Sequence, residues 1–171
     1  LREEGRIPED AVACPGHTIA TPSERVPDAW PALESPRAAV IDYILDSHYD
    51  LWEWDDDRAR DIFASRIARQ TDLNDLQSEG EMAAAYEQWE WATRMALFTH
   101  GDLRIYDWFY IDWWLPLWDP AYVDAWASTP PGLRYGKQLQ NELAQDMYAA
   151  TADVDTEQAA RTGTDWGPFD Q

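Results

Sequence analysis

Tryptophan density constrains the fold of this chain more than any other feature of its sequence. Each indole is a large, rigid apolar surface, and the core of a small protein has limited room for such groups. A chain of 171 residues suits one domain. The dense segment therefore either packs an unusually aromatic core or presents aromatic side chains to a partner. Seven tryptophans fall between Tyr86 and Trp126: Trp89, Trp91, Trp108, Trp113, Trp114, Trp118 and Trp126.

The remainder of the composition is strongly acidic. Lysine and arginine number 13 against 33 aspartates and glutamates, a formal net charge of −20, which argues against direct nucleic-acid binding. Three interpretations of the acidity stay open: a solvated surface, a surface for a basic partner subunit, and mimicry of nucleic-acid phosphates. Cys14 is the only cysteine, which excludes an internal disulfide or a multi-thiolate metal site. No apolar run reaches the length that spans a bilayer and no signal-peptide pattern stands at the start, so we expect no membrane span and a cytoplasmic protein.

Hydrophobic periodicity predicts an all-α fold, a single irregular helical domain of about five or six helices over residues 35–152. Residues 1–34 are rich in proline and are expected to form an extended arm, and residues 153–171 an acidic tail. Alternation typical of strands is absent. The expected helices run from Pro36 to about His48, from Asp55–Asp57 past Ile67, from Met82 to about His100, near Ile105–Trp114, from Pro120 to about Ala127, and around Leu139–Met147.

Local signals support several of these boundaries. Ser35-Pro36 and Asp119-Pro120 each place a good N-cap residue before a proline at the first helical position. Gly101 stands where a residue after a helix C-terminus belongs. Apolar residues between Asp102 and Leu117 are too dense for a surface helix, so the helix expected there is predicted to be buried on most sides.

Candidate reactive groups do not form a complete active site. His17, His48 and His100 lack the spacing of metal ligands, and we expect packing or helix-capping roles for them. Cys14-Pro-Gly-His17 is typical of a turn in an arm, although a Cys/His pair is the alternative. The acidic cluster at Glu53 and Asp55–Asp57 suits a helix start; the alternatives are acid–base catalysis or a hard cation site. No phosphate-binding glycine loop or serine nucleophile elbow exists.

Arg60 is the candidate functional residue of this region. It follows the acidic helix start, and one interpretation is a surface arginine paired with Asp56 or Asp57. The other interpretation is a guanidinium that binds an oxyanion such as a carboxylate or an oxidised sulfur. Because the chain lacks a complete active site, a reactive centre would have to come from another chain.

The order of these segments resembles the N-terminal helical region of nitrile hydratase β subunits, the related thiocyanate hydrolase subunit and the small nitrile hydratase accessory proteins. The resemblance covers roughly residues 35–105. It rests on Ser35-Pro36, on Tyr49-Asp-Leu-Trp-Glu-Trp54 leading to Asp-Asp-Asp-Arg58-Ala-Arg60, and on Tyr86-Glu-Gln-Trp89 followed by Gly101-Asp-Leu103. The family β subunit continues into a small β barrel, whereas residues 106–171 look helical or irregular. The segment Trp113-Trp-Leu-Pro-Leu-Trp118 has no counterpart in the family.

The resemblance implies a partner subunit of a cobalt or iron enzyme that hydrates a nitrile or hydrolyses thiocyanate or a similar small molecule. The metal would lie in another chain that carries the Cys-x-x-Cys-Ser-Cys motif, and this chain would bind no cofactor alone. The implied partners are this metal-bearing subunit and a third small subunit. Arg60 falls where the family has an arginine that hydrogen-bonds the oxidised cysteines of the metal site.

Our leading hypothesis is thus a non-catalytic helical subunit that packs on a metal-bearing chain, although whether the chain serves an enzyme at all stays open. The alternative is an acidic helical interaction protein without a catalytic role: an assembly chaperone, a viral or phage structural component, or a nucleic-acid mimic. A third possibility is an accessory subunit of a different enzyme complex. The aromatic residues expected at an interface are Trp108, Trp113, Trp114, Trp118, Tyr86 and Trp89, with the block from Trp108 to Trp118 as the main contact surface.

Overall fold

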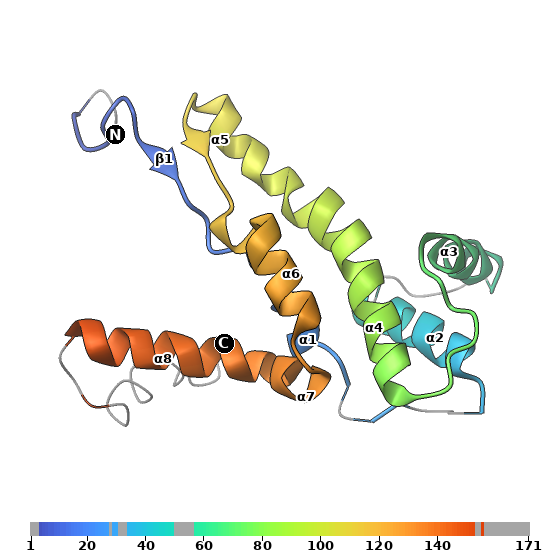
Figure 1. The fold of residues 1–171 in the computed structure, drawn as a ribbon. Helices are drawn as coiled ribbons and strands as arrows, with labels where there is room; N and C mark the ends of the chain where they lie inside the picture. Colours follow the sequence, from blue (N-terminus) through green and yellow to red (C-terminus); the bar gives the residue numbers. More distant parts are fainter. Residues whose placement is uncertain (1–3, 28, 31–33, 50–56, 153–154, 156–171) are drawn as a thin grey trace, which may run out of the picture.

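The computed structural model describes residues 4–27, 29–30, 34–49, 57–152 and 155, and Figure 1 shows a fold built almost entirely from helices. The all-α prediction is confirmed. The α-helices are α1 (Thr21–Glu24), α2 (Pro36–His48), α3 (Asp57–Gln70), α4 (Glu79–Glu90), α5 (Arg104–Trp108), α6 (Pro120–Ser128), α7 (Pro131–Arg134) and α8 (Gln138–Ala152). A π-helix, η1 (Trp91–Thr99), continues α4, and three 3₁₀ turns follow: η2 (Gly101–Leu103), η3 (Pro116–Trp118) and η4 (Tyr135–Lys137).

Capping side chains explain where the main helices begin. Pro36 and Pro120 occupy first-turn positions of α2 and α6, and the Asp119 side chain accepts from the Ala121 amide at 3.0 Å. At the start of α4, the Ser78 hydroxyl accepts from the Glu81 amide at 3.3 Å, while the Glu81 carboxylate accepts from the Gln77 amide at 2.7 Å. This reciprocal capping starts α4 before Met82, where periodicity alone predicted it to begin.

The main hydrophobic core lies between α2, α3 and α4. Each helix contributes one apolar stripe, and the residues on it recur at helical spacing. Tyr86 and Trp89 belong to this core and are almost completely buried, so they are not on the contact surface predicted from the sequence. The buried members are Trp30, Ala39, Val40, Ile44, Leu45, Ile67, Leu73, Met82, Ala83, Ala85, Tyr86 and Trp89.

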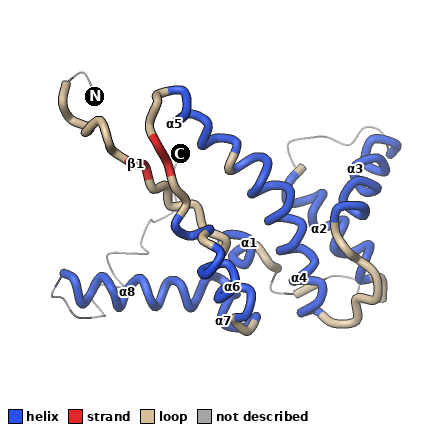
Figure 2. Tube along the Cα trace, turned by 45° about the horizontal axis from the view of Figure 1, so that its top comes forward, coloured by secondary structure: helices blue, strands red, loops and turns tan. Residues whose placement is uncertain are grey.

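The N-terminal segment, expected to be an extended arm, packs along the chain's own helices. Ile19 and Ala20 form a second core cluster with Trp126 of α6, and the Trp91 indole donates to the Ile19 carbonyl at 2.8 Å. Earlier in the same segment, strand β1 (Val12–Ala13) pairs in parallel with strand β2 (Asp112–Trp113), and Figure 2 shows both in red. Ile19 and Ala20 belong to no periodic apolar pattern, and they are buried only because residues distant in the sequence pack against them.

The segment after η1 differs most from the sequence prediction. A buried helix was expected near Ile105–Trp114, but α5 ends at Trp108 and contains no buried residue. Tyr110 then adopts a positive φ of 55°, which stops the helix and turns the chain back toward β1. The dense apolar residues therefore remain on the outside instead of entering the core.

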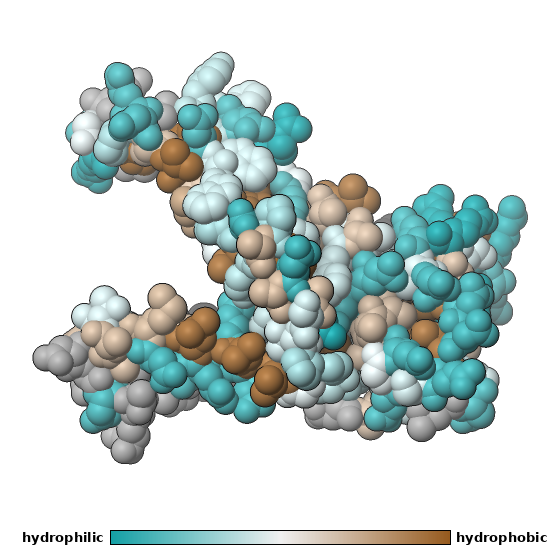
Figure 3. Space-filling model, viewed as in Figure 1, coloured by the Kyte–Doolittle hydropathy of each residue, from teal (hydrophilic) through white to brown (hydrophobic). Residues whose placement is uncertain are grey.

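Two projections leave the central helices and give the molecule an open shape. In Figure 1, α5 and the β1–β2 pair lie at one end of the α4–η1 rod, and α8 extends away on the same side of the molecule. The space-filling view in Figure 3 shows a hollow between these two projections. Of the helices that the structure describes, none has the length and apolar character needed to cross a membrane. The predicted tail at 153–171 lies outside the described residues except for Asp155, as do Glu53, Asp55 and Asp56.

Candidate functional site

The end of the molecule around α5 exposes a group of large apolar side chains, which we call the aromatic surface. Trp108 is 79% exposed and Tyr110 is 86% exposed, in contrast to the buried tryptophans of the core. Monomeric proteins seldom leave large apolar patches in water, and such patches mark interaction sites. The members of the aromatic surface are Ile105, Trp108, Phe109, Tyr110 and Trp114.

Polar contacts hold the aromatic surface in a defined conformation. Asp107 accepts from the Trp113 indole at 3.0 Å and from the Arg104 side chain at 2.6 Å. The hydrogen bond from Trp113 and the one from Arg104 lower the pKa of Asp107 below its ordinary value. Trp113 is half-buried and anchors the turn, so it projects less than its neighbours. Arg104, Asp107, Trp108 and Tyr110 also line an open pocket of about 580 Å³.

Tyr110 combines high exposure with an unfavourable backbone conformation. A bulky side chain at φ 55° is uncommon, because Cβ crowds the neighbouring carbonyl oxygen. We expect Tyr110→Gly to raise the free energy of unfolding by about 0.5–1 kcal/mol, since glycine adopts this conformation without that crowding. Urea denaturation measures the change, and Tyr106→Gly, inside α5, is the control that should destabilise. A loss of stability in Tyr110→Gly would show that the tyrosine side chain contributes to the fold.

A second apolar stripe runs along α8. Leu139, Leu143 and Met147 recur every four residues, and all three are exposed, as is the neighbouring Tyr148. Within α8, whose residues are all described, Ala149 is the one buried residue. Figure 3 shows hydrophobic side chains along α8 at the edge of the hollow. The α5 end of the molecule and α8 lie on either side of this hollow.

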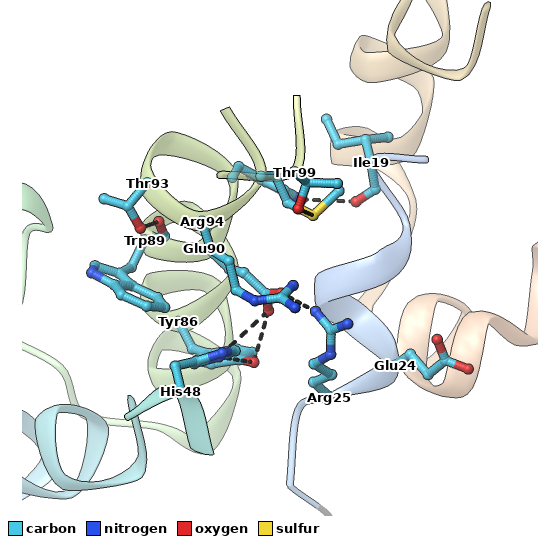
Figure 4. Close-up of polar contacts among 12 residues, drawn as sticks. Ile19, Glu24, Arg25, His48, Tyr86, Trp89, Glu90, Thr93, Arg94 and Thr99 are labelled. Atoms are coloured by element: carbon cyan, nitrogen blue, oxygen red, sulfur yellow. Dashed lines mark hydrogen bonds and ion pairs between the residues drawn. The ribbon is translucent and has the colours of Figure 1, made fainter. Parts of the chain in front are cut away.

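A cluster of buried charges centres on Glu90 of α4. Its carboxylate has no exposed area and binds Arg25, Arg94 at 3.1 Å, and the Tyr86 hydroxyl at 2.7 Å (Figure 4). His48 lies 3.0 Å from the same hydroxyl and stacks on Tyr86. Burial, followed by the nearby Glu90 charge, raises the pKa of Tyr86. His48 thus has the packing role that the sequence predicted.

Glu87, one helical turn away, makes a second buried charge contact. It accepts from the Ser23 hydroxyl of α1 and pairs with Arg134 of α7 at 2.8 Å. Burial raises the pKa of Glu87, against the opposing effects of Ser23 and Arg134. Together Glu87 and Glu90 tie the N-terminal segment and α7 to α4. Neither glutamate was predicted from the sequence to be functional or buried. The available signal was their position beside Tyr86 and Trp89 on a helix with an apolar face.

Arg60 of α3 pairs with two aspartates of α2. Its guanidinium donates to Asp42 at 2.8 Å and to Asp46 at 3.2 Å. These contacts join α3 to α2, and all three side chains retain contact with water. Partial burial lowers the pKa of Arg60, but the hydrogen bonds to Asp42 and Asp46 more than compensate and raise it. Of the predicted partners, Asp56 lies outside the described residues.

The remaining histidines approach each other near η3. His100 packs edge-on against Trp118, with 4.3 Å between ring centroids, and it lies close enough to His17 for their charges to interact. Buried ring nitrogens of both histidines, Nδ1 of His17 and Nε2 of His100, have no hydrogen-bond partner. Cys14 is exposed. Throughout the described ranges, no three histidine, cysteine or acidic side chains gather in a way that could hold a metal ion.

Protonation of His100 should destabilise the fold. Burial, and then the proximity of His17, hold the pKa of His100 below its ordinary 6.5. As the pH falls, the unfolded chain binds the proton first, so stability is lost between that value and the lower pKa of the folded state. We expect the urea midpoint to fall more in the wild type than in His100→Gln between neutral pH and about pH 5. Equal losses in the two proteins would contradict a buried neutral His100.

The aromatic surface is the region that the sequence and the structure both single out. Of the aromatic residues expected at an interface, Trp108 and Trp114 are exposed, Trp113 and Trp118 are half-buried, and Tyr86 and Trp89 are in the core. Comparisons of this chain with models of protein families, with curated proteins and with solved structures found no match.

Proposed function

We propose that this chain is a helical, non-catalytic subunit that docks on another protein through the aromatic surface. The exposure of Trp108 and Tyr110, held on a turn that Asp107 fixes, is the observation that carries the proposal. Aromatic side chains supply much of the binding energy in protein interfaces. Hydrogen–deuterium exchange tests the proposal: amides of residues 105–114 should exchange more slowly in a complex, whereas unchanged exchange there would reject this surface.

The net charge of the chain indicates what kind of charge its partner carries. A net charge of −20 favours a partner with basic groups around its contact surface, because complementary charges speed association and exclude acidic competitors. The α8 face offers a second contact region across the hollow.

As the finer part of the proposal, the partner is a metal-bearing subunit of a nitrile hydratase-like or thiocyanate hydrolase-like complex. Its support is the resemblance of residues 35–105. Tyr86 and Trp89, which belong to that resemblance, lie on α4 in the core that it shares with α2 and α3. Cobalt or iron in the partner would act as a Lewis acid that activates water or a small substrate. This chain would cover the metal-bearing subunit and bind no metal itself.

Arg60 provides the residue-level test of this finer proposal. If its guanidinium supports the partner's oxidised cysteines, Arg60→Lys should lower turnover of the complex roughly tenfold or more, because lysine cannot make the same paired hydrogen bonds. The complex should still assemble. Arg58→Lys, two residues earlier on α3, is the matched control. Turnover unchanged in Arg60→Lys would leave Arg60 with only its contacts to Asp42 and Asp46.

The alternative function, an acidic interaction protein without an enzyme partner, is favoured by the excess of acidic residues alone. A nucleic-acid mimic would compete with DNA for a basic protein, and that competition would weaken as salt rises. An assembly chaperone would be absent from the mature complex. Loss of DNA competition at high salt, without dependence on Trp108, would favour the alternative over docking through the aromatic surface.

A further inference from the structure

The pocket on the aromatic surface combines the groups that bind a cationic side chain. Its volume is about 580 Å³, and it is lined by Arg104, Asp107, Trp108 and Tyr110. The first three of these residues occupy positions i, i+3 and i+4, so they lie on one face of α5. A cation is attracted to the face of an aromatic ring, best of all to tryptophan, and to a carboxylate. The pocket therefore offers both kinds of contact to one cation.

The two groups that would contact this cation are open to water. Trp108 is 79% exposed, and the side chain of Asp107 is 47% exposed. Trp113 and Arg104 each donate a hydrogen bond to Asp107, and the two bonds go to different carboxylate oxygens. A carboxylate has about four acceptor positions. Asp107 can therefore accept a further donor while it still holds Trp113.

The charges in this part of the chain favour a cation over an anion. Residues 101–114 contain three aspartates and one arginine, and the whole chain has a net charge of −20. The one arginine is Arg104, which already pairs with Asp107 at 2.6 Å. Ion pairs between exposed side chains are weak. A second guanidinium that also stacks on Trp108 would therefore have an advantage over Arg104 in the competition for Asp107.

We propose that the partner inserts an arginine side chain into this pocket, where the guanidinium stacks on the Trp108 indole and donates to the Asp107 carboxylate in place of Arg104. Arginine suits the pocket better than lysine, because its planar guanidinium stacks on aromatic rings and matches a carboxylate with paired hydrogen bonds. In the unbound chain, Arg104 holds Asp107 in position. This inference rests on the proposed docking function and specifies the residue that the partner supplies.

The test adds two capped tripeptides to the full chain, acetyl-Ala-Arg-Ala-amide and acetyl-Ala-citrulline-Ala-amide. Citrulline has nearly the shape of arginine but carries no charge. The Trp108 indole resonance is followed by ¹H–¹⁵N NMR and assigned from Trp108→Phe. The arginine peptide should shift this resonance, and the citrulline peptide at the same concentration should not, because the attraction to the ring and to Asp107 depends on the positive charge. A resonance that neither peptide shifts, or that both shift equally, would overturn the proposal.

Charge variants identify the group that recognises the peptide. Asp107→Asn should bind the arginine peptide roughly threefold to fivefold more weakly, as expected for an exposed charge pair. Asp146→Asn removes the same charge from the exposed surface of α8 and should bind like the wild type. Arg104→Gln should bind roughly twofold more tightly, because the competitor for Asp107 is gone.

Equal binding by Asp107→Asn and Asp146→Asn would count against the arginine site. Weaker binding by Arg104→Gln would also reject it, and would show that Arg104 itself takes part in recognition. Failure of this inference is distinct from failure of the docking function. Slower amide exchange at residues 105–114 in a complex, with an unshifted Trp108 resonance, would reject arginine insertion alone. A Trp108 resonance that the arginine peptide shifts, with unchanged exchange in the complex, would reject docking through this surface instead.

Discussion

Replacement of Glu90 with alanine is expected to lower the free energy of unfolding by about 3 kcal/mol, the low end of the range for breaking a buried ion pair. The change leaves Arg25 and Arg94 without their shared carboxylate and removes the acceptor of the Tyr86 hydroxyl. The low end applies because both arginines are about one-third exposed and water can partly solvate them. Urea denaturation monitored by tryptophan fluorescence gives the value.

Glu142→Ala is the matched control for this change. Glu142 lies on the exposed surface of α8, so its replacement should alter stability by no more than about 0.5 kcal/mol. If Glu90→Ala were as stable as Glu142→Ala, the buried charges would not be what holds the N-terminal segment on α4. Increased proteolysis within residues 4–27 of Glu90→Ala would show that the buried charges do hold this segment on α4, because Arg25 belongs to it.

The double substitution Trp108→Ser and Trp114→Ser should reduce binding of a hydrophobic dye by roughly half or more while leaving stability nearly unchanged. Both indoles are exposed, so their removal takes little from the core. The backbone contact of Trp114, whose amide donates to the Ala13 carbonyl at 2.9 Å, is retained in the variant. Dye fluorescence and the thermal midpoint are measured on the same samples.

Ile62→Ser tests whether that effect is specific to the aromatic surface. Ile62 is exposed on α3, which Figure 1 places on the far side of α4 from α5. This variant should bind dye like the wild type. Equal dye binding by the double tryptophan variant and the wild type would mean that the aromatic surface is not the main accessible apolar region of the chain.

The helices that the sequence predicted best are those with local signals. Proline after a capping residue marks the starts of α2 and α6, and regular apolar spacing marks the stripes of α3 and α4. Such signals depend on residues within one turn of each other, so a single sequence contains them. Ile44, Leu45 and Ile67, on the helices expected at 36–48 and from 55–57 past 67, are accordingly in the main core.

The features that were missed depend on contacts between distant residues. Ile19 and Ala20 are buried only because Trp126 of α6 covers them, and β1 exists only because β2 pairs with it. The helical pattern alone would place Glu87 and Glu90 in solvent. They are buried because Ser23, Arg25 and Arg134, which belong to other segments, bind them. For the aromatic surface, the sequence identified the tryptophans Trp108 and Trp114. It did not predict the turn at Tyr110 that exposes them, because that turn has no local signal.

Native mass spectrometry of the chain co-expressed with its neighbouring genes, combined with metal analysis, tests the proposed subunit role most directly. We expect a stable complex with a cysteine-motif chain that carries stoichiometric cobalt or iron. We also expect that Trp108→Ser with Trp114→Ser abolishes this complex, while Ile62→Ser preserves it, because interface aromatics contribute most of the binding energy. A stable lone monomer, or a complex that the double tryptophan variant leaves intact, would contradict the account.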